Sequence, residues 1–284
     1  MTVITAPGAA SKKRRTTRTL LYIALSLGLV ATLLPFAWML LGSIKPTGEI
    51  IADPNAWLPK DPTLENFGAL LSKANFGLYF ANSLIVAGVC VAGNLLFCSM
   101  AGYAFAKIDF AGKKTLFALV LVMLVIPGIA TFVPLFVTVS NLGLANSYPG
   151  LILPFLVTPL GVFLMRQFIA DIPDSLIEAA NLDGAGELRI FTRIVLPLSG
   201  PPLATLAILT FLGQWNNFLW PLVIAQTEDK YTLPVALALF SVGANGTNYG
   251  LMLAGAVVVV LPILFLFLFL QRYFIQGIAN TGIK

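Results

Sequence analysis

The sequence predicts an all-α membrane protein with six transmembrane helices. Hydrophobic residues make up 58% of its 284 residues and charged residues only 10%, whereas roughly a quarter of a soluble domain is charged. Six stretches without a charged residue are each long enough to cross a bilayer as a helix: 20–41, 82–105, 115–135, 148–165, 204–225 and 249–270. One membrane domain, residues 20–270, therefore accounts for most of the chain.

The first stretch follows a basic tail, residues 1–19, with five positive side chains: Lys12, Lys13, Arg14, Arg15 and Arg18. Such a tail favours a cytoplasmic N-terminus, and we expect it to be a disordered topology signal rather than a nucleic-acid-binding segment. The stretch is longer than the apolar region of a signal peptide, and residues 43–46 offer no small-residue cleavage site. It is expected to remain as a helix.

The remaining basic residues predict the same orientation. With the N-terminus inside, only four of the 17 lysines and arginines lie outside: Lys45, Lys60, Lys73 and Lys230. The C-terminal tail, 271–284, is then cytoplasmic as well. This bias explains the net charge of +5 without nucleic acid.

The next elements follow from local chemistry. Four prolines and Trp57 predict an ordered but irregular outer loop over 42–81. Cys90 and Cys98 are eight residues apart in one helix, about 12 Å along its axis, so they are expected to be packing residues without a disulfide. Pro127, Gly128 and Pro134 predict kinks in the third stretch, or alternatively a hinge for gating.

A charged segment, 166–203, separates the fourth and fifth stretches. Pro173 suits the first turn of a helix, which is expected to run from about 173 to 182. Gly184 can adopt the left-handed conformation that ends a helix. One side of this helix is expected to be a mostly small, smooth ridge beside Glu178, formed by Leu176, Ala179, Ala180 and Asp183.

A second helical run follows the glycine. Leu188, Phe191 and Val195 are expected to share one face, and Pro197 with the cluster at 200–202 closes the run. The segment is therefore predicted to form a helix–turn–helix elbow, on the cytoplasmic side by the charge bias.

This elbow resembles the EAA motif of binding-protein-dependent ABC importer permeases, in which Glu-Ala-Ala precedes a glycine and then Ile-x-Leu-Pro. The matching residues are Glu178, Ala179, Ala180, Gly184, Ile194, Leu196 and Pro197. Phe191, the DGA at 183–185 and the RQF at 166–168 are similar to the maltose-type (MalG-like) carbohydrate branch. Further similar segments are SIKP at 43–46, NS at 82–83, AGYAFAK at 101–107, IPG at 126–128 and WNNFLWPL at 215–222.

The resemblance implies a type I importer permease fold with both termini in the cytoplasm. It also implies that one part of the elbow contacts an ATPase subunit: Glu178, Ala179, Ala180, Asp183, Gly184, Ala185 and Gly186. Glu178 would lie near a basic group of the ATPase, and Ala179 and Ala180 would be small because the partner surface lies against them. The alternative for Glu178 is an ordinary solvated helix charge.

The implied assembly contains two ATPase subunits, a homologous second permease and an extracytoplasmic solute-binding protein, in a bacterial or archaeal cell membrane. The chain has no GxxxxGK[ST] phosphate loop, so ATP and Mg are expected on the partner ATPases and no cofactor on this chain. It has no histidine, which removes histidine-based triads and histidine-ligated zinc. We expect no catalytic and no metal-binding residue.

Polar residues in the fifth stretch lie about 15 Å along the helix from residue 204, near mid-membrane: Gln214, Trp215, Asn216 and Asn217. Their polar groups need partners in lipid. Bonds between helices and a translocation path for sugar hydroxyls both satisfy that need.

The outer segment 226–247 has two interpretations as well. It is either a simple connection or, by the resemblance, a loop that contacts the binding protein through Gly243, Ala244, Asn245 and Gly246.

The acidic residues separate classes of transporter. All twelve lie outside the six stretches, whereas proton-coupled carriers place ionisable groups within the membrane. The expected function is the ATP-driven import of a sugar or oligosaccharide. Import of glycerol phosphate is the alternative within the family, and a channel or structural subunit is the alternative outside it.

Overall fold

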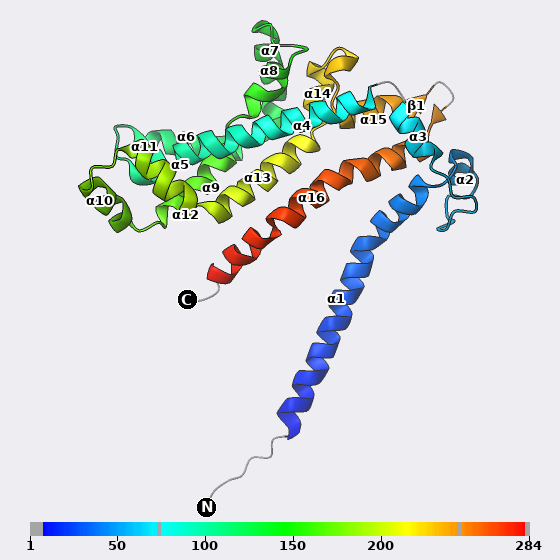
Figure 1. Ribbon diagram of the computed structural model, residues 1–284, viewed down its shortest axis with the longest axis horizontal. Coiled ribbons are helices and arrows are strands. Elements are labelled where there is room, and N and C mark those ends of the chain that lie inside the picture. Colours follow the sequence, from blue (N-terminus) through cyan, green and yellow to red (C-terminus); the bar gives the residue numbers. More distant parts are fainter. Residues whose placement is uncertain (1–7, 73–74, 244–245, 282–284) are drawn as a thin grey trace, which may run out of the picture. The chain divides into compact units, whose positions relative to one another are not determined.

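The computed structural model describes residues 8–72, 75–243 and 246–281, which are almost entirely helical (Figure 1). The first helices are α1 (Gly8–Ser43), α2 (Thr47–Ala52), α3 (Glu65–Ser72), α4 (Phe76–Gly93), η1 (Asn94–Cys98), α5 (Ser99–Lys107), α6 (Lys113–Val125) and α7 (Gly128–Asn141). The middle ones are α8 (Tyr148–Ile152), η2 (Leu153–Phe155), α9 (Pro159–Ala170), α10 (Asp174–Leu182), α11 (Glu187–Ile190), η3 (Phe191–Val195) and α12 (Leu196–Leu198). The last elements are α13 (Gly200–Trp215), α14 (Leu219–Ile224), η4 (Glu228–Lys230), α15 (Leu233–Ser241), β1 (Val242–Gly243), β2 (Gly246–Thr247) and α16 (Tyr249–Thr281).

The chain divides into two units, and each is described by itself. The first unit lies within Met1–Ser72 and Gly243–Val258. Its longest element is α1, which already begins at Gly8. The basic run at 12–15 is therefore helical, and the expectation of a disordered tail is wrong for residues 8–19.

The segment after α1 is more regular than an irregular loop, because it contains α2 and α3. Asn66 on α3 is buried, and its Nδ2 donates to the carbonyls of Ser43 (2.9 Å) and Lys45 (2.7 Å). A Cβ on Gly250 would lie 2.4 Å from Asn66 Oδ1. The amide thus bonds α3 to the end of α1, and Gly250 at the start of α16 leaves room for it, which the proline content did not predict.

The second unit lies within Lys73–Val242 and Val259–Lys284. Its longest span is unbroken from Phe76 to Lys107 and contains a π-helical stretch, η1. Close packing explains Gly102, because a Cβ there would lie 2.7 Å from Met165 Cβ on α9. Small residues at such contacts allow membrane helices to approach closely.

The third predicted span is not one helix. It is divided into α6 and α7, whose axes differ by 106°. Pro127 explains the break, because it has no N–H to donate and disfavours helical geometry at the residue before it. Ile126 accordingly has extended angles, φ −74° and ψ 120°.

The fourth and fifth predicted spans are also interrupted. The fourth bends by 41° between Phe155 and Pro159. In the predicted fifth span, α13 already ends at Trp215, and the chain turns through Asn216 before α14 begins. A further bend of 80° separates Glu187–Leu198 from α13. Three helices of the described chain are long and apolar enough to cross a membrane, or six spans if each bent pair counts as one.

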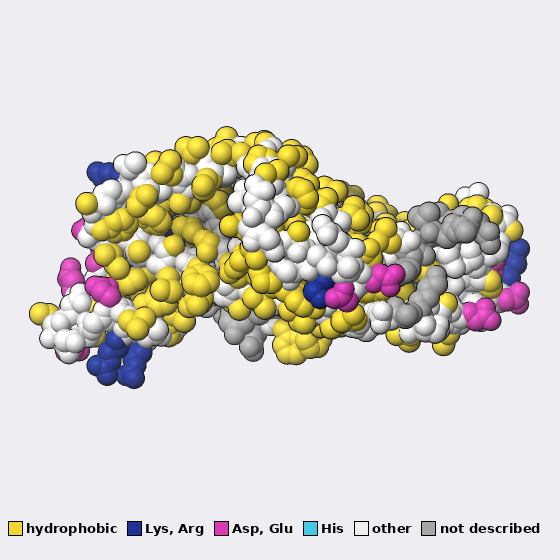
Figure 2. Space-filling view, turned by 90° about the horizontal axis from the view of Figure 1, so that it is seen from above, with side chains coloured by type: hydrophobic (Ala, Val, Ile, Leu, Met, Phe, Trp, Pro, Cys, Tyr) yellow, Lys and Arg dark blue, Asp and Glu magenta, His cyan; other side chains and the backbone are white. Residues whose placement is uncertain are grey.

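The second unit has its core where the helices meet, α5 against α9 and α4 against α13. Cys90 and Cys98 are both buried and free, which confirms their assignment as packing residues. Many side chains on the outside are apolar, such as Val125 at 82% exposure. Figure 2 shows hydrophobic side chains over much of this face, with charged side chains at the end that carries α10 and α11 and in separate groups elsewhere. The fold is that of an all-α membrane protein.

Candidate functional site

The first arm of the predicted elbow is α10, which begins one residue after Pro173. Ile177 and Ala180 are its buried residues and pack into the unit's own core. Glu178 and Ala179 are exposed, and Leu182 is 90% exposed. The prediction that Ala179 and Ala180 both face a partner is therefore wrong for Ala180, which is small because it packs against this chain. Ala179 remains available to a partner.

The corner after α10 is built as the glycine predicts. Gly184 has φ +76°, a left-handed conformation that side chains disfavour. Its N–H donates to the Asn181 carbonyl (3.0 Å), and the N–H of Ala185 donates to the Ala180 carbonyl (2.9 Å). This pair of bonds is the Schellman motif.

The second arm consists of α11, η3 and α12. Ile190, Phe191 and Val195 are buried, but Leu188 is 70% exposed. Phe191 and Val195 therefore pack into the core, whereas Leu188 stays exposed and lines a hollow together with Phe191. The π-helical turn of η3 departs from the regular 3.6-residue spacing on which the prediction of a shared face depended.

Two side chains of α5 hold the elbow, one before the first arm and one just after the corner. Lys107, whose side chain is 5% exposed, reaches the segment just before α10: its Nζ donates to the carbonyl of Ile172 (2.6 Å) and to Oδ1 of Asp174 (2.6 Å). Tyr103 is buried, and its hydroxyl donates to Oε2 of Glu187 (2.6 Å), just after the corner. Both belong to the AGYAFAK segment, to which the sequence assigned no role.

Glu178 itself makes no ion pair within the described chain, and its side chain faces solvent. An exposed carboxylate beside a small residue is suited to a basic group on another protein. Among all the residues that the structure describes, no three or more His, Cys, Asp or Glu residues cluster in a way that could hold a metal ion.

The polar group near the end of α13 does not act as one lining. Trp215 is 1% exposed, stacks on Phe211 and donates from Nε1 to the carbonyl of Val259 (2.9 Å). Asn216 is exposed, and its Nδ2 donates back to α13, to the carbonyl of Leu212 (3.0 Å). Asn217 is half-buried. Trp215 therefore packs between helices, and Asn216 is the exposed member of the four.

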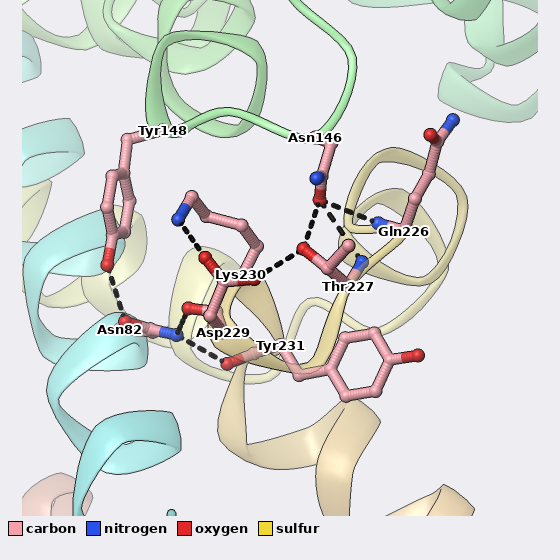
Figure 3. Close-up of polar contacts among 8 residues, drawn as sticks. All are labelled: Asn82, Asn146, Tyr148, Gln226, Thr227, Asp229, Lys230 and Tyr231. Atoms are coloured by element: carbon pink, nitrogen blue, oxygen red, sulfur yellow. Dashed lines mark hydrogen bonds and ion pairs between the residues drawn. The ribbon is translucent and has the colours of Figure 1, made fainter.

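The segment that follows α14 is pinned to the rest of the unit by side-chain amides (Figure 3). Oδ1 of Asn146 accepts from the N–H of Gln226 (3.0 Å) and from the N–H and hydroxyl of Thr227 (3.2 and 3.0 Å). Asn82 is fully buried, and its Nδ2 donates to the carbonyls of Asp229 (3.0 Å) and Tyr231 (2.9 Å). The segment is fixed rather than a loose connection.

Charges at this segment are paired. Lys230 forms an ion pair with Asp229, and the hydroxyl of Thr227 shares its single proton between Asp229 Oδ1 (2.5 Å) and Asn146 Oδ1 (3.0 Å). These two bonds, the lysine's first, lower the pKa of the Asp229 carboxyl below its usual value, and the same ion pair raises the pKa of Lys230. Of the residues predicted to contact a binding protein, Gly243 and Gly246 lie in β1 and β2, while Ala244 and Asn245 lie outside the described residues.

The sequence matches the family described as binding-protein-dependent transport system inner membrane component over residues 97–280. It is 43% identical over 255 residues to the arabinooligosaccharides transport system permease protein AraQ of Halalkalibacterium halodurans, covering 88% of this chain and 90% of that protein. It is 36% identical over 280 residues to the diacetylchitobiose uptake system permease protein NgcG of Streptomyces coelicolor, covering 98% and 92%.

The fold has a counterpart among solved structures. A chain in the crystal structure of a bacterial ABC transporter involved in the import of the acidic polysaccharide alginate superposes with a TM-score of 0.82 at 23% identity, over 96% of this chain and 100% of that one. The family match includes the whole elbow. The chain therefore belongs to the binding-protein-dependent transport system inner membrane components, as a non-catalytic, multi-pass permease subunit of an ABC importer.

Proposed function

We propose that this permease imports a neutral oligosaccharide. The two relatives described above are named for the uptake of arabinooligosaccharides and diacetylchitobiose. All acidic residues lie outside the stretches predicted to cross the membrane, and the accessible polar group near the middle of the fifth one is the uncharged amide of Asn216. An uncharged amide suits sugar hydroxyls, which both donate and accept hydrogen bonds.

The elbow is the proposed docking surface for an ATPase subunit. Its geometry is the main support for ATP-driven import. Its corner is fixed by two backbone bonds, and the exposed Glu178 and Ala179 lie on the helix that this corner ends. The proposed complex contains this chain, a homologous permease, two ATPase subunits that bind ATP and Mg, and an extracytoplasmic binding protein. ATP-driven approach of the ATPases would move the two elbows and switch the permeases between inward- and outward-facing states.

Reconstitution of the full complex in proteoliposomes tests this function. With loaded binding protein outside and ATP inside, we expect uptake of a labelled neutral oligosaccharide and stimulated ATP hydrolysis. Glycerol phosphate and a charged oligosaccharide serve as competitors and should leave uptake unchanged. Competition by glycerol phosphate would contradict the proposed neutral oligosaccharide substrate. Uptake without ATP would contradict ATP-driven import.

A further inference from the structure

One helix of the second unit is held firmly at both of its ends. The span Phe76–Lys107 comprises 32 residues, about 48 Å at a rise of 1.5 Å per residue. It is formed by α4, η1 and α5 in one unbroken run. A helix of this length reaches from one side of a membrane to the other.

The inner clamp is the pair of contacts made by Lys107 and Tyr103. Lys107 holds the segment before α10, and Tyr103 holds Glu187, the first residue of α11. The lysine is almost fully buried while its partner Asp174 is 74% exposed, so the amine is committed to protein atoms. Hydrogen bonds that involve a charged group are stronger than neutral ones. These contacts join the elbow to α5 on both sides of α10.

The outer clamp is made by Asn82 and its neighbour Ser83. Asn82 uses both N–H donors on the carbonyls of Asp229 and Tyr231, and its oxygen accepts from the Tyr148 hydroxyl (2.6 Å). The hydroxyl of Ser83 accepts from the N–H of Leu233 (2.7 Å), the first residue of α15. Asn82 and Ser83 are 0% and 3% exposed. Because leaving a buried polar group unpaired is unfavourable, the segment 229–233 is fixed to α4.

We propose that the helix 76–107 is the element that carries motion of the elbow to the outer segment 229–233, with Lys107, Tyr103, Asn82 and Ser83 as its positioning residues. The inference rests on the proposed function in one respect, that an ATPase docks on the elbow. The two clamps connect the nucleotide-driven side to the side that faces the binding protein. Loss of either clamp disconnects the same path.

This arrangement predicts a specific non-additivity. Tyr103 and Ser83 are about 30 Å apart along the helix, and substitutions so far apart normally have additive effects. Tyr103→Phe removes only the hydroxyl that bonds to Glu187 and keeps the ring, which packs on Phe191 at 5.7 Å. Ser83→Ala removes only the acceptor for Leu233. Both changes are small enough for the complex to assemble.

The readout is the ratio of ATP hydrolysis with and without loaded binding protein in the reconstituted full complex. We expect each single variant to lower this ratio at least about fivefold, the lower end of typical coupling between sites. The double variant should be no lower than the worse single one. Lys113→Met is the matched control, because the ion pair of Lys113 within the described residues is a local one with Asp109, outside both clamps. Its ratio should equal that of wild type.

Two outcomes overturn the inference. Wild-type ratios in both single variants would show that the clamps do not transmit motion of the elbow to the segment 229–233. A double variant whose loss is the product of the two single losses would show that the clamps act independently. Glu187→Gln supplies a further check, since a glutamine oxygen still accepts from Tyr103 and should retain most of the ratio. Failure of the proposed function is distinguishable, because the wild-type complex itself would then show no stimulation.

Discussion

The N–H of Ala185 donates to the carbonyl of Ala180 across the corner of the elbow, at 2.9 Å. Ala180 is buried in the core of the unit, and Ala185 packs partly against the same cluster. This bond directs the chain from α10 into the second arm, and it depends on the left-handed conformation of Gly184 between the two alanines. The corner therefore fixes how α10, which carries the exposed Glu178, is joined to the second arm.

Gly184→Ala tests that corner. Nothing lies within 4 Å of a Cβ built there, so the only penalty is conformational, about 1–2 kcal/mol. We expect weaker co-purification of the ATPase and a several-fold loss of uptake. Gly112→Ala is the matched control, since Gly112 also has open space and a positive φ of +83° but lies outside the elbow. Equal losses of ATPase binding in both variants would contradict a specific role for the corner.

Glu178→Lys tests docking by charge. The side chain is exposed, so the fold should be retained, while the new positive charge would repel the basic group proposed on the ATPase. Uptake is expected to fall steeply, and reversal of a single basic partner residue to Glu should partly restore it. Asp109→Lys, an exposed reversal outside the elbow, should have little effect. Normal association and uptake with Glu178→Lys would remove the docking assignment.

The elbow was predictable because its signals are local. Pro173 and Gly184 each specify a backbone conformation through their own chemistry, and the structure has the corresponding helix start and corner. The six apolar stretches were predictable as well, from length and absence of charge. The breaks within these stretches were only partly predictable. A kink was expected at Pro127, but the structure has a bend of 106° that divides the span into two helices.

Burial and long-range partners were not predictable. Sequence spacing could not show that Ala180 packs inward, or that the Trp215 N–H is paired with Val259, because both depend on which helices meet. Likewise, the role of Lys107 depends on contacts 63 to 67 positions away, and that of Asn82 on contacts 66 to 149 positions away. The AGYAFAK and NS segments that contain them were the one available signal.

Asn216→Ala and Trp215→Ala are expected to have different effects on complex assembly and on uptake. Trp215 is a core residue, so its truncation should cost about 3–5 kcal/mol and reduce the amount of assembled complex. Asn216 is exposed, so its truncation should leave the melting temperature nearly unchanged while lowering uptake. Uptake per assembled complex separates the two effects. Unchanged uptake kinetics in Asn216→Ala would favour ordinary packing over a solute path.

The Asp229 carboxyl gives a pH signature for the outer segment. The pKa of Asp229 is lower in the folded protein than its ordinary value of about 3.9. The ionised carboxylate therefore stabilises the fold fully at a pH above the ordinary pKa, and this stabilisation is lost as the pH falls through the lowered pKa. The melting temperature of Asp229→Asn should therefore lie below that of wild type at about pH 5 to about pH 8, with the gap closing in stronger acid. Lys230→Met should move the closing point to higher pH. A gap that persists in strong acid would contradict the assignment to ionised Asp229.

Asn146 separates backbone geometry from hydrogen bonding at the outer segment. Its φ is +53°, and its Oδ1 accepts three bonds from Gln226 and Thr227. Asn146→Gly loses those bonds but tolerates the left-handed backbone, whereas Asn146→Ala also bears a conformational penalty of about 1–2 kcal/mol. We expect both variants to lower stimulation of ATP hydrolysis by loaded binding protein to the same extent, because both release the segment. Only the alanine variant should lose additional thermal stability. Full stimulation with Asn146→Gly would show that the segment does not need this anchor to meet the binding protein.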